Sequence, residues 1–387
     1  MNFSPRTHIS PSRTVAVNSL ALEKRLAGER VYNLSAGEPM IGTPAVISRA
    51  AMDAIDAGKT HYESVSGIPA LRDAVSTWMN TTYGSHFSRT QTLVTAGGKH
   101  GVSLLVDAML IPGDEALIVA PYWVSYVSQV EMAGATPVVI PTAEKDGWKV
   151  TPADIDAHCT AQTKLLILNN GSNPAGVLYT TQELQAILDM AAQHDIVVIS
   201  DEVYSGLVYD GVDYISCASF ADHVSRVIVV QSMSKHFAMT GWRVGFVFAD
   251  EQIIRVLCTL QGQTTSGAST ISQWAALAGL QHADDIVPVH RAQMQARRDV
   301  FCQRFGEAFG HALPPAGSGL YQFIPLTAFG IVETDADAFC TRVLAEANVA
   351  MVPGEAFGVG GYVRCSFGET EEELKDAIEA LHAYLVK

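Results

Sequence analysis

Short apolar runs rich in β-branched residues recur along the middle of the chain, from about Gln91 to Gln281, and segments with helical spacing separate most of them. The seven runs are Thr92–Thr95, Ala116–Ala120, Pro137–Ile140, Lys164–Leu168, Ile196–Ser200, Val227–Val230 and Val244–Phe248. The clearest helical periods are Lys99–Leu110, Val124–Ala133 and Thr181–His194. Continuous apolar strands separated by helices are typical of a mainly parallel sheet with both faces covered. The pattern therefore predicts an α/β fold built on a mainly parallel, seven-stranded sheet.

The pattern changes from about Asp284, where strands and helices no longer alternate regularly. We expect the helices Pro288–Gly306, Asp335–Ala347 and Thr370–Leu385 and the strands Leu320–Pro325, Val349–Val352 and Val363–Ser366. Thr370 is a suitable N-cap because Glu373 follows three residues later. These elements predict a smaller α+β domain at residues 284–387. We assign residues 46–283 to the large domain, and residues 1–45 to an N-terminal segment that forms part of the small domain.

Composition narrows the class of protein. Hydrophobic residues make up 48% of the 387 residues and charged residues 17%, which is typical of folded chains and not of disordered ones. The net charge of −15 argues against nucleic acid or an anionic membrane as a partner. Residues 1–13 lack the apolar stretch of a signal peptide, and no run approaches the roughly 20 apolar residues that span a bilayer. The six scattered cysteines predict free thiols, a cytoplasmic location and no metal site.

The segment Ser232–Gly245 carries the clearest chemical signal. It contains Lys235 among small residues, and Arg243 follows eight positions later. A desolvated lysine loses its proton readily and forms a Schiff base with a carbonyl group, while a guanidinium suits a phosphate. An aldehyde and a phosphate on one molecule describe pyridoxal 5'-phosphate (PLP). Lys235 would hold this cofactor and, once freed by substrate, move the α-proton, for which its pKa must be lowered. The alternative is a solvated loop.

Several other polar or glycine residues follow directly after predicted strands. They are Gly97, Gly98 and Lys99 after the first strand, Asn173 after the fourth, and Asp201 and Tyr204 after the fifth. Because functional residues of such sheets gather at the carboxyl ends of the strands, we expect these residues to share one site. Taken singly, each of them also fits ordinary turn or helix-capping chemistry.

The ring of PLP would find a partner for each of its polar groups. Asp201 can pair with the protonated pyridine nitrogen, which keeps the ring electron-poor and stabilises a carbanion at the substrate α-carbon. Asn173 and Tyr204 can donate to the ring oxygen, and Trp123 can stack on the ring face. Trp123 and Asn173 are also candidates to contact the substrate.

The phosphate can be assigned in the same way. Gly97 and Gly98 let backbone amides approach a phosphate at the start of the following helix, where Lys99 also lies. Ser232 and Arg243 can complete the phosphate site.

Ten segments spread over nearly the whole chain form a series with a characteristic order and spacing. They are Leu34–Pro39, Gly67–Arg72, Thr95–Lys99, Pro112–Glu115, Ala120–Tyr126, Ser172–Gly176, Asp201–Tyr204, Ser234–Gly245, Val352–Gly354 and Tyr362–Arg364. In this order and spacing the series resembles the class I/II PLP-dependent aminotransferases of fold type I, most closely the bacterial aspartate aminotransferases. Each segment alone would be a weak signal, but the set is specific.

The resemblance implies roles for three further residues. The backbone of Gly37 and the guanidinium of Arg364 would hold the substrate α-carboxylate, so that a bidentate pair orients the α-carbon over the cofactor. Tyr62 would reach the phosphate in a neighbouring subunit, which makes the protein a homodimer by resemblance. The alternatives are a surface position on an edge strand for Arg364 and simple core packing for Tyr62.

The chain departs from the family pattern at several places. The loop Asn169–Gly176 lacks the usual proline and has alanine in place of threonine, so we expect a looser loop. Arg13 stands where a small residue is common. It would meet a side-chain carboxylate of the substrate or, as we favour, belong to an exposed loop. His236 directly follows Lys235, and we expect it to pack rather than to act on the cofactor.

Three functions are compatible with such a site. The first is transamination, in which an α-amino acid, aspartate by resemblance, gives its amino group through a Schiff base at Lys235 and a pyridoxamine form to a 2-oxo acid such as 2-oxoglutarate. The second is a PLP-dependent lyase, cyclase or oxidase of specialised biosynthesis. The third is a non-catalytic PLP-binding regulator, whose basic DNA-binding head has no counterpart in this acidic chain. We expect the first.

Overall fold

The computed structural model of the chain describes residues 4–7 and 9–386. Its centre is a seven-stranded sheet in the order β2-β8-β7-β6-β5-β3-β4. The strands are β2 (Thr92–Thr95), β3 (Glu115–Val119), β4 (Thr136–Ile140), β5 (Thr163–Asn169), β6 (Val197–Asp201), β7 (Val227–Ser232) and β8 (Gly245–Phe248). Strand β8 is antiparallel to both of its neighbours and the other pairs are parallel. The seven predicted strands and the α/β fold class are confirmed.

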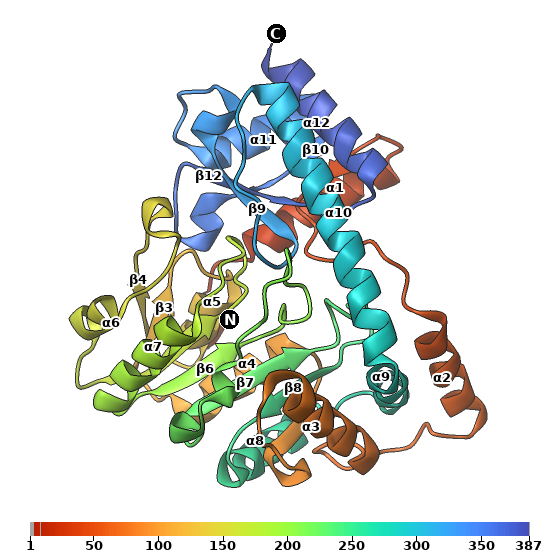
Figure 1. Cartoon of the computed structure of the whole chain (residues 1–387), viewed down its shortest axis with the longest axis vertical. Coiled ribbons are helices and arrows are strands. Elements are labelled where there is room, and N and C mark those ends of the chain that lie inside the picture. The colour runs from red at the N-terminus through yellow and green to blue at the C-terminus, as the bar shows by residue number, and fades with distance from the viewer. Residues whose placement is uncertain (1–3, 8, 387) are drawn as a thin grey trace.

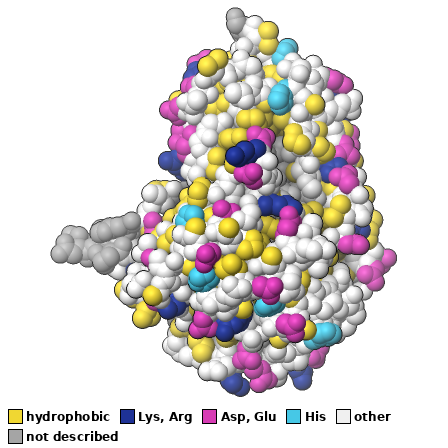
Figure 2. All heavy atoms as spheres, turned by 60° about the vertical axis from the view of Figure 1, so that its left-hand side comes forward, with side chains coloured by type: hydrophobic (Ala, Val, Ile, Leu, Met, Phe, Trp, Pro, Cys, Tyr) yellow, Lys and Arg dark blue, Asp and Glu magenta, His cyan; other side chains and the backbone are white. Residues whose placement is uncertain are grey.

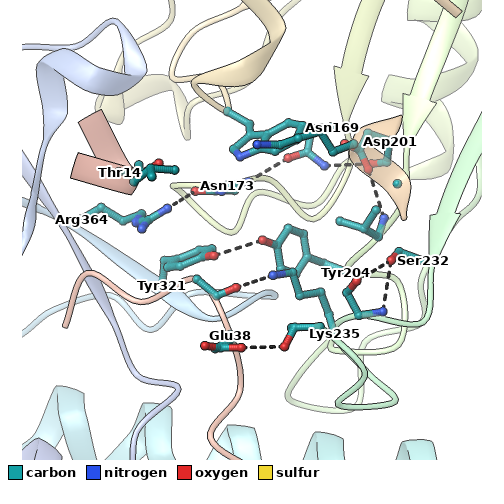
Figure 3. A pocket seen from close by; sticks show the side chains of 18 of the residues that line it. Thr14, Glu38, Asn169, Asn173, Asp201, Tyr204, Ser232, Lys235, Tyr321 and Arg364 are labelled. Atoms are coloured by element: carbon teal, nitrogen blue, oxygen red, sulfur yellow. Dashed lines mark hydrogen bonds between the residues drawn. The ribbon is translucent and has the colours of Figure 1, made fainter. Parts of the chain in front are cut away.

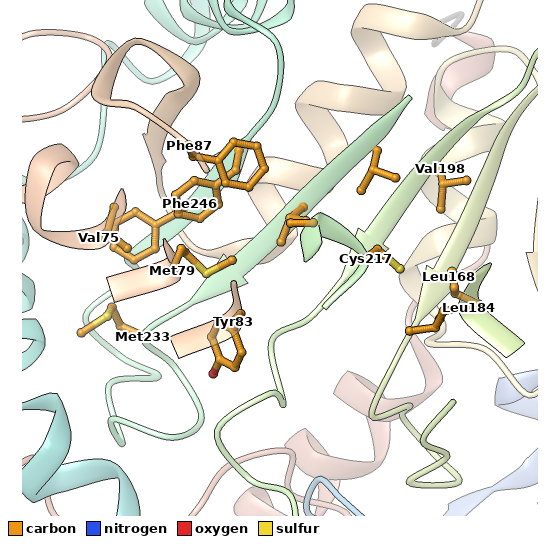
Figure 4. Packing of buried hydrophobic residues seen from close by; sticks show 14 of the residues in the cluster. Val75, Met79, Tyr83, Phe87, Leu168, Leu184, Val198, Cys217, Met233 and Phe246 are labelled. Carbon is orange, nitrogen blue, oxygen red and sulfur yellow. The ribbon is translucent and has the colours of Figure 1, made fainter. Parts of the chain in front are cut away.

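Helices cover both faces of this sheet because its strands bury apolar side chains on both sides. In β5, Leu165 and Ile167 face one layer of helices, and Leu166 and Leu168 face the other. The first layer contains α4 (Gly98–Met109), α5 (Ser125–Met132) and α8 (Glu251–Thr264). The second contains α2 (Ala45–Asp56), α3 (Pro69–Tyr83), α6 (Pro152–His158), α7 (Thr181–Gln193) and α9 (Thr270–Gln281), and part of its packing is visible in Figure 4.

A smaller set of strands joins the two ends of the chain. Strand β1 (Tyr32–Asn33) pairs in parallel with β10 (Val349–Ala350). Strands β11 (Val352–Pro353), β12 (Tyr362–Ser366) and β9 (Tyr321–Pro325) form an antiparallel sheet with β12 in the middle. The helices around them are α1 (Arg13–Leu26), α11 (Ala336–Ala347) and α12 (Glu371–Leu385) in the upper part of Figure 1, together with the upper end of α10 (Ala283–Phe309).

Short 3-10 helices complete the described structure. They are Pro5–Thr7, Arg89–Gln91, Glu144–Asp146, Cys217–Ser219, Ala221–His223, Leu326–Phe329 and Gly354–Phe357. The long helix α10 runs from the lower part of the molecule, beside α9, to the upper part, beside α12 (Figure 1). Since the N-terminal strand β1 pairs with β10, we retain the boundaries at residues 45 and 283 as a proposal.

Two predicted elements differ from the structure. Helix α10 begins at Ala283 and not at Pro288, because one interior proline removes only a single backbone hydrogen bond and the acidic Asp284 and Asp285 favour the first turn. The predicted strand Val349–Val352 is two strands, β10 and β11, that join different sheets. The predicted cap is confirmed, since Thr370 accepts a hydrogen bond from the backbone of Glu373 at 3.3 Å.

On the face shown in Figure 2, acidic and basic side chains are interspersed. All six cysteines are free thiols, as predicted from their spacing. Among the described residues, none of the helices combines the length and apolar character needed to cross a lipid bilayer. The cytoplasmic location stays a prediction.

Candidate active site

A pocket of about 390 Å³ lies at the carboxyl ends of β5, β6 and β7, facing the small sheet and the segment after β1 (Figure 3). Most of the residues predicted from the sequence line it together. These are Gly37, Gly98, Lys99, Trp123, Asn173, Asp201, Tyr204, Ser232, Lys235, Arg243 and Arg364. Gly97 precedes Gly98 at the edge of this pocket, and Tyr62 lies elsewhere. This arrangement agrees with our expectation that the strand ends bring these residues together.

Lys235 follows β7 and extends into the pocket rather than into solvent. Its Nζ donates a hydrogen bond to the carbonyl oxygen of Gly37 and lies 5.8 Å from the centre of the Tyr204 ring. Gly37 belongs to the segment after β1, so the lysine spans the space between the large sheet and the N-terminal segment. The side chain is half-buried and has no carboxylate partner among the described residues. The amine is therefore positioned to react with a group that enters the pocket.

Asp201 ends β6 and is buried at the back of the pocket. Its Oδ2 accepts a hydrogen bond of 2.6 Å from the Tyr126 hydroxyl, and its Oδ1 accepts one of 3.3 Å from the backbone of Val203. Burial raises the pKa of Asp201 to about 6, although these two hydrogen bonds and the charge of Lys235 act in the opposite direction. A carboxyl group in this state is readily held ionised by a cation placed beside it. The sequence did not point to Tyr126, which lies on α5.

The loop after β5 is fixed by hydrogen bonds despite its departures from the family pattern. Asn169 accepts a 2.9 Å hydrogen bond from the backbone of Asn173 and donates one of 2.8 Å to the carbonyl of Asp201. Ser172 accepts from Val177 at 3.1 Å. These contacts hold the Asn173 side chain toward the pocket where a proline would have stiffened the chain. Asn169 carries no signal in the sequence that would mark it as a site residue.

Arg364 lies on β12, the middle strand of the small sheet, and is only 2% exposed. Its Nη1 donates to Asn173 Oδ1 at 3.1 Å and its Nη2 to the carbonyl of Ser35 at 2.8 Å. The guanidinium lies 4.1 Å from the centre of the Tyr321 ring. Its Nε is buried and has no hydrogen-bond partner among the described residues. The alternative of a surface position on an edge strand is therefore wrong.

The opposite end of the pocket presents backbone amides and cations. Gly97 has a φ of +90°, and Gly98 begins α4, whose first amides are free of helix partners. Ser232 ends β7 and donates to Ser234 at 2.8 Å. The Arg243 guanidinium is held by backbone carbonyls, and within the described residues it pairs with no carboxylate. This end therefore suits a dianion such as a phosphate.

Two more predicted residues lie between these ends. The Lys99 Nζ lies 5.0 Å from the centre of the Trp123 ring, and Trp123 packs edge-on against Tyr126. Partial burial and then the charges of Arg243 and Lys235 lower the pKa of Lys99. A negative charge that enters the pocket would stabilise the protonated form of Lys99.

Three predicted residues lie outside the pocket. Arg13 is exposed, as we favoured, but it is the first residue of α1 and not part of a loop, and it forms an ion pair with Asp337 on α11. Tyr62 is 93% exposed, so simple core packing is wrong. It lines a second pocket with residues 265–271. His236 is buried and stacks on Trp78 at 5.6 Å, as the packing prediction requires, and burial lowers its pKa to about 3.

The arrangement fits a small aromatic ring that carries a carbonyl group and a phosphate. Residue 97 has no space for a side chain, because a Cβ there would lie 2.5 Å from Nη2 of Arg243. The unpaired Nε of Arg364 leaves a donor for an anionic group at the other end. A lysine and a buried carboxyl group, Asp201, lie between them. The donor set therefore matches PLP and an amino acid together.

This fold and pocket define the chain as an aminotransferase of fold type I. Residues 29–381 match the family described as aminotransferase class I and II. The chain belongs to this family, which is PLP-dependent, and family membership sets aside the hypothesis of a non-catalytic regulator.

Relatives match over almost the full length of the chain. The aspartate/prephenate aminotransferase of Cereibacter sphaeroides is 37% identical over 97% of this chain and 96% of the relative. The asparagine–oxo-acid transaminase of Streptococcus mutans is 35% identical over 97% of each. The solved structure of the aspartate aminotransferase from Thermus thermophilus with maleate covers 99% of each chain with a TM-score of 0.93 and 34% identity.

Proposed function

We propose that the chain transfers the amino group of an α-amino acid, aspartate by default, to a 2-oxo acid such as 2-oxoglutarate, with PLP as its cofactor. The observation that carries the proposal is Arg364, a buried cation in the same pocket as Lys235 without a carboxylate partner among the described residues. A buried charge without a partner is costly unless a ligand supplies one. The α-carboxylate common to all amino acids is such a ligand.

The cofactor would be held by residues from several strand ends. Gly97, Gly98, Ser232 and Arg243 would bind its phosphate, Trp123 would cover its ring, Asp201 would face the ring nitrogen, and Asn173 and Tyr204 would donate to the ring oxygen. When bound, PLP supplies an electron sink that makes the α-proton of an attached amino acid acidic. Asp201 favours this because its carboxylate, supported by Tyr126, stabilises a proton on the ring nitrogen.

The α-carboxylate would be held by Arg364 and by the backbone of Gly37. Asn173 already binds Nη1 of Arg364, which fixes the plane of the guanidinium. A fixed fork of donors orients the α-carbon and thereby limits which of its bonds can react. Lys235 would move the α-proton, and in the structure its Nζ donates a hydrogen bond to the carbonyl oxygen of Gly37, the residue proposed to hold the α-carboxylate.

One cation of the pocket is a candidate to bind a second carboxylate of a dicarboxylic donor. Four cations line the pocket, Lys99, Lys235, Arg243 and Arg364, against the two carboxyl groups of Glu38 and Asp201. A phosphate and an α-carboxylate account for Arg243 and Arg364. Lys99, beside Trp123, is left for the phosphate or for a second carboxylate of the substrate. The name of the Cereibacter relative, an aspartate/prephenate aminotransferase, favours the second carboxylate, and the name of the Streptococcus relative keeps asparagine as an alternative donor.

We further propose that two copies of the chain form the working enzyme. Tyr62 is 93% exposed, and the nearby helix α2 also exposes Met52 and Ile55 by about half. Large exposed apolar side chains that gather on one face are typical of an interface. In the dimer, Tyr62 would contribute to the phosphate site of the neighbouring subunit.

Single-turnover mixing tests the proposed reaction. The enzyme loaded with PLP is mixed with a panel of amino acids without an acceptor, and the visible absorbance of the cofactor is followed. We expect aspartate to change it fastest, with oxaloacetate as product and no ammonia. Release of ammonia and pyruvate would indicate a lyase instead, and no change with any amino acid would overturn the proposal.

The substitution Lys99→Met tests the role of Lys99. If it reads a second carboxylate, KM rises for aspartate and stays unchanged for a neutral donor such as asparagine. If Lys99 binds the phosphate instead, the affinity for PLP falls, and any change in KM is the same for aspartate and for asparagine. Equilibrium titration of the unloaded enzyme with PLP separates the two outcomes.

A further inference from the structure

Tyr321 lines the pocket, and the proposed function leaves it without a role. It is the first residue of β9 and pairs with Ser366 of β12. Its hydroxyl lies 3.2 Å from that of Tyr204, and the dashed line between them in Figure 3 joins the small sheet to the large domain. Tyr321 is 2% exposed and Tyr204 4%. Two buried hydroxyl groups thus share one hydrogen bond within the site.

Charged groups surround the Tyr321 side chain. The guanidinium of Arg364 lies against its ring at 4.1 Å. The Nζ of Lys235 lies on the opposite side, close to the Tyr204 ring and hydrogen-bonded to Gly37. The Tyr321 hydroxyl also lies on the side of Gly37 where a side chain would begin, since a Cβ at position 37 would lie 3.0 Å from it. The phenol is therefore placed between two cations.

The number of protons decides which of the two hydroxyls donates. Each phenol has one proton, and by distance alone either oxygen can accept in the shared bond. In the proposed function Tyr204 gives its proton to the ring oxygen of the cofactor, so its own oxygen can only accept from Tyr321. With the cofactor bound, Tyr321 therefore donates to Tyr204.

We propose that Tyr321 is a positioning residue that fixes Tyr204 as a donor toward the ring oxygen of the cofactor. The inference rests on the proposed function. In a chain of hydrogen bonds each bond strengthens the next, so Tyr204 donates more strongly than an isolated phenol would. A donor to an anionic oxygen favours the deprotonated state. The hydroxyl of Tyr321 therefore lowers the pH at which the visible absorbance of the bound cofactor changes.

The pH titration of this absorbance tests the inference in the enzyme loaded with PLP. Tyr321→Phe removes the hydroxyl and keeps the ring over Arg364. We expect the midpoint to rise by roughly 0.4 to 1 pH unit, the equivalent of one neutral hydrogen bond. Tyr204→Phe raises it further, and adding Tyr321→Phe to that variant gives no additional shift, because both hydroxyls act through one bond.

Tyr209→Phe is the matched control. Tyr209 is also a buried tyrosine, but its hydroxyl donates to the carbonyl of Gly319 and does not line the pocket. Its loss should leave the midpoint unchanged. An unchanged midpoint in Tyr321→Phe, or the same shift with and without the Tyr204 hydroxyl, overturns the inference.

Kinetics separate positioning from structural support. With Phe at position 321 the stack on Arg364 remains, so we expect kcat to fall several-fold while KM for the amino acid stays within about twofold. Tyr321→Leu removes the stack as well, and KM should then rise. A rise in KM without a fall in kcat for Tyr321→Phe contradicts the inference. A wild-type enzyme without visible absorbance or amino transfer would instead defeat the proposed function itself.

Discussion

Arg243 lies against the backbone of Gly97, at the position where a side chain of residue 97 would begin. The guanidinium is fixed there by hydrogen bonds from Nη1 to the carbonyl of Thr240 at 2.8 Å and from Nη2 to the carbonyl of Ala96 at 3.3 Å. A Cβ at position 97 would lie 2.5 Å from Nη2, and the φ of +90° already disfavours any residue but glycine. The cation and the backbone amides of α4 can meet one phosphate only because this position has no side chain.

The substitution Gly97→Ala should therefore weaken the binding of PLP. We expect an affinity loss of roughly tenfold or more, since the guanidinium must move away from the amides. Gly113→Ala is the control, because Gly113 has a φ of +101° and no atom within 4 Å of its Cβ position. Titration of the unloaded enzyme with PLP compares the two. An equal loss in both variants would mean that backbone strain alone is responsible.

Lys235→Ala should abolish both amino transfer and the visible absorbance of the bound cofactor. The reason is that no other amine replaces it, since Lys99 lies over Trp123. Absorption spectra and single-turnover assays check this. Activity that survives the substitution would reassign the reactive amine.

Arg364→Lys should raise KM strongly for every amino-acid substrate. A lysine keeps the charge but loses the fork of donors that Asn173 and Ser35 hold in place. We expect a loss of roughly 10²-fold in kcat/KM for aspartate and for neutral donors alike, equivalent to about 3 kcal/mol. Steady-state kinetics with several donors measure it. A loss confined to dicarboxylic donors would assign Arg364 to the substrate side chain instead.

Glu202, next to Asp201, is buried with an unusual set of contacts. Its Oε1 accepts from Ser200 at 2.9 Å, Ser216 at 3.0 Å and the backbone of Cys217 at 2.9 Å. Its Oε2 is buried and has no partner among the described residues. Burial raises the pKa of Glu202 from 4.5 to about 7, although these hydrogen bonds lower it.

The stability of the enzyme without PLP should therefore depend on the proton of Glu202. Between pH 4.5 and 7 the folded state holds a proton that the unfolded state has lost, so this contribution is present at low pH and disappears as pH rises. Relative to Glu202→Gln, we expect the wild type to lose up to about 3 kcal/mol of unfolding free energy across this window. Urea unfolding at pH 5 and pH 7.5 measures the difference, with the exposed Glu372→Gln as control.

The sequence predicted the large sheet well because its strands are buried on both faces. Each strand is then a continuous apolar run, as in Leu165–Leu168, and the runs are separated by helices. The small sheet was harder to predict from the sequence. Its segment Val349–Val352 forms one strand in each of two sheets, and no local sequence pattern marks the residue at which the pairing changes from one sheet to the other. Helix α10 began earlier than predicted because a single Pro288 does not end a long, well-packed helix.

The candidate site was predictable where chemistry requires an unusual residue in an unusual place. Lys235 among small residues and Asp201 after a strand are of this kind. Tyr321, Tyr126 and Asn169 gave no such signal, because an aromatic residue or an amide near a strand is ordinary in sequence. Their importance depends on contacts made across the fold, such as that of Tyr126 with Asp201. Pairing of β9 with β12, known in advance, would have placed Tyr321 near Arg364.

The pairing of β1 with β10 has a consequence for synthesis of the protein on the ribosome. Gly37, which meets Lys235, follows β1, and β1 has no partner until Val349 and Ala350 have been translated. Domains generally fold as units while the chain emerges. The nascent large sheet therefore lacks one wall of its pocket until these two residues have been translated.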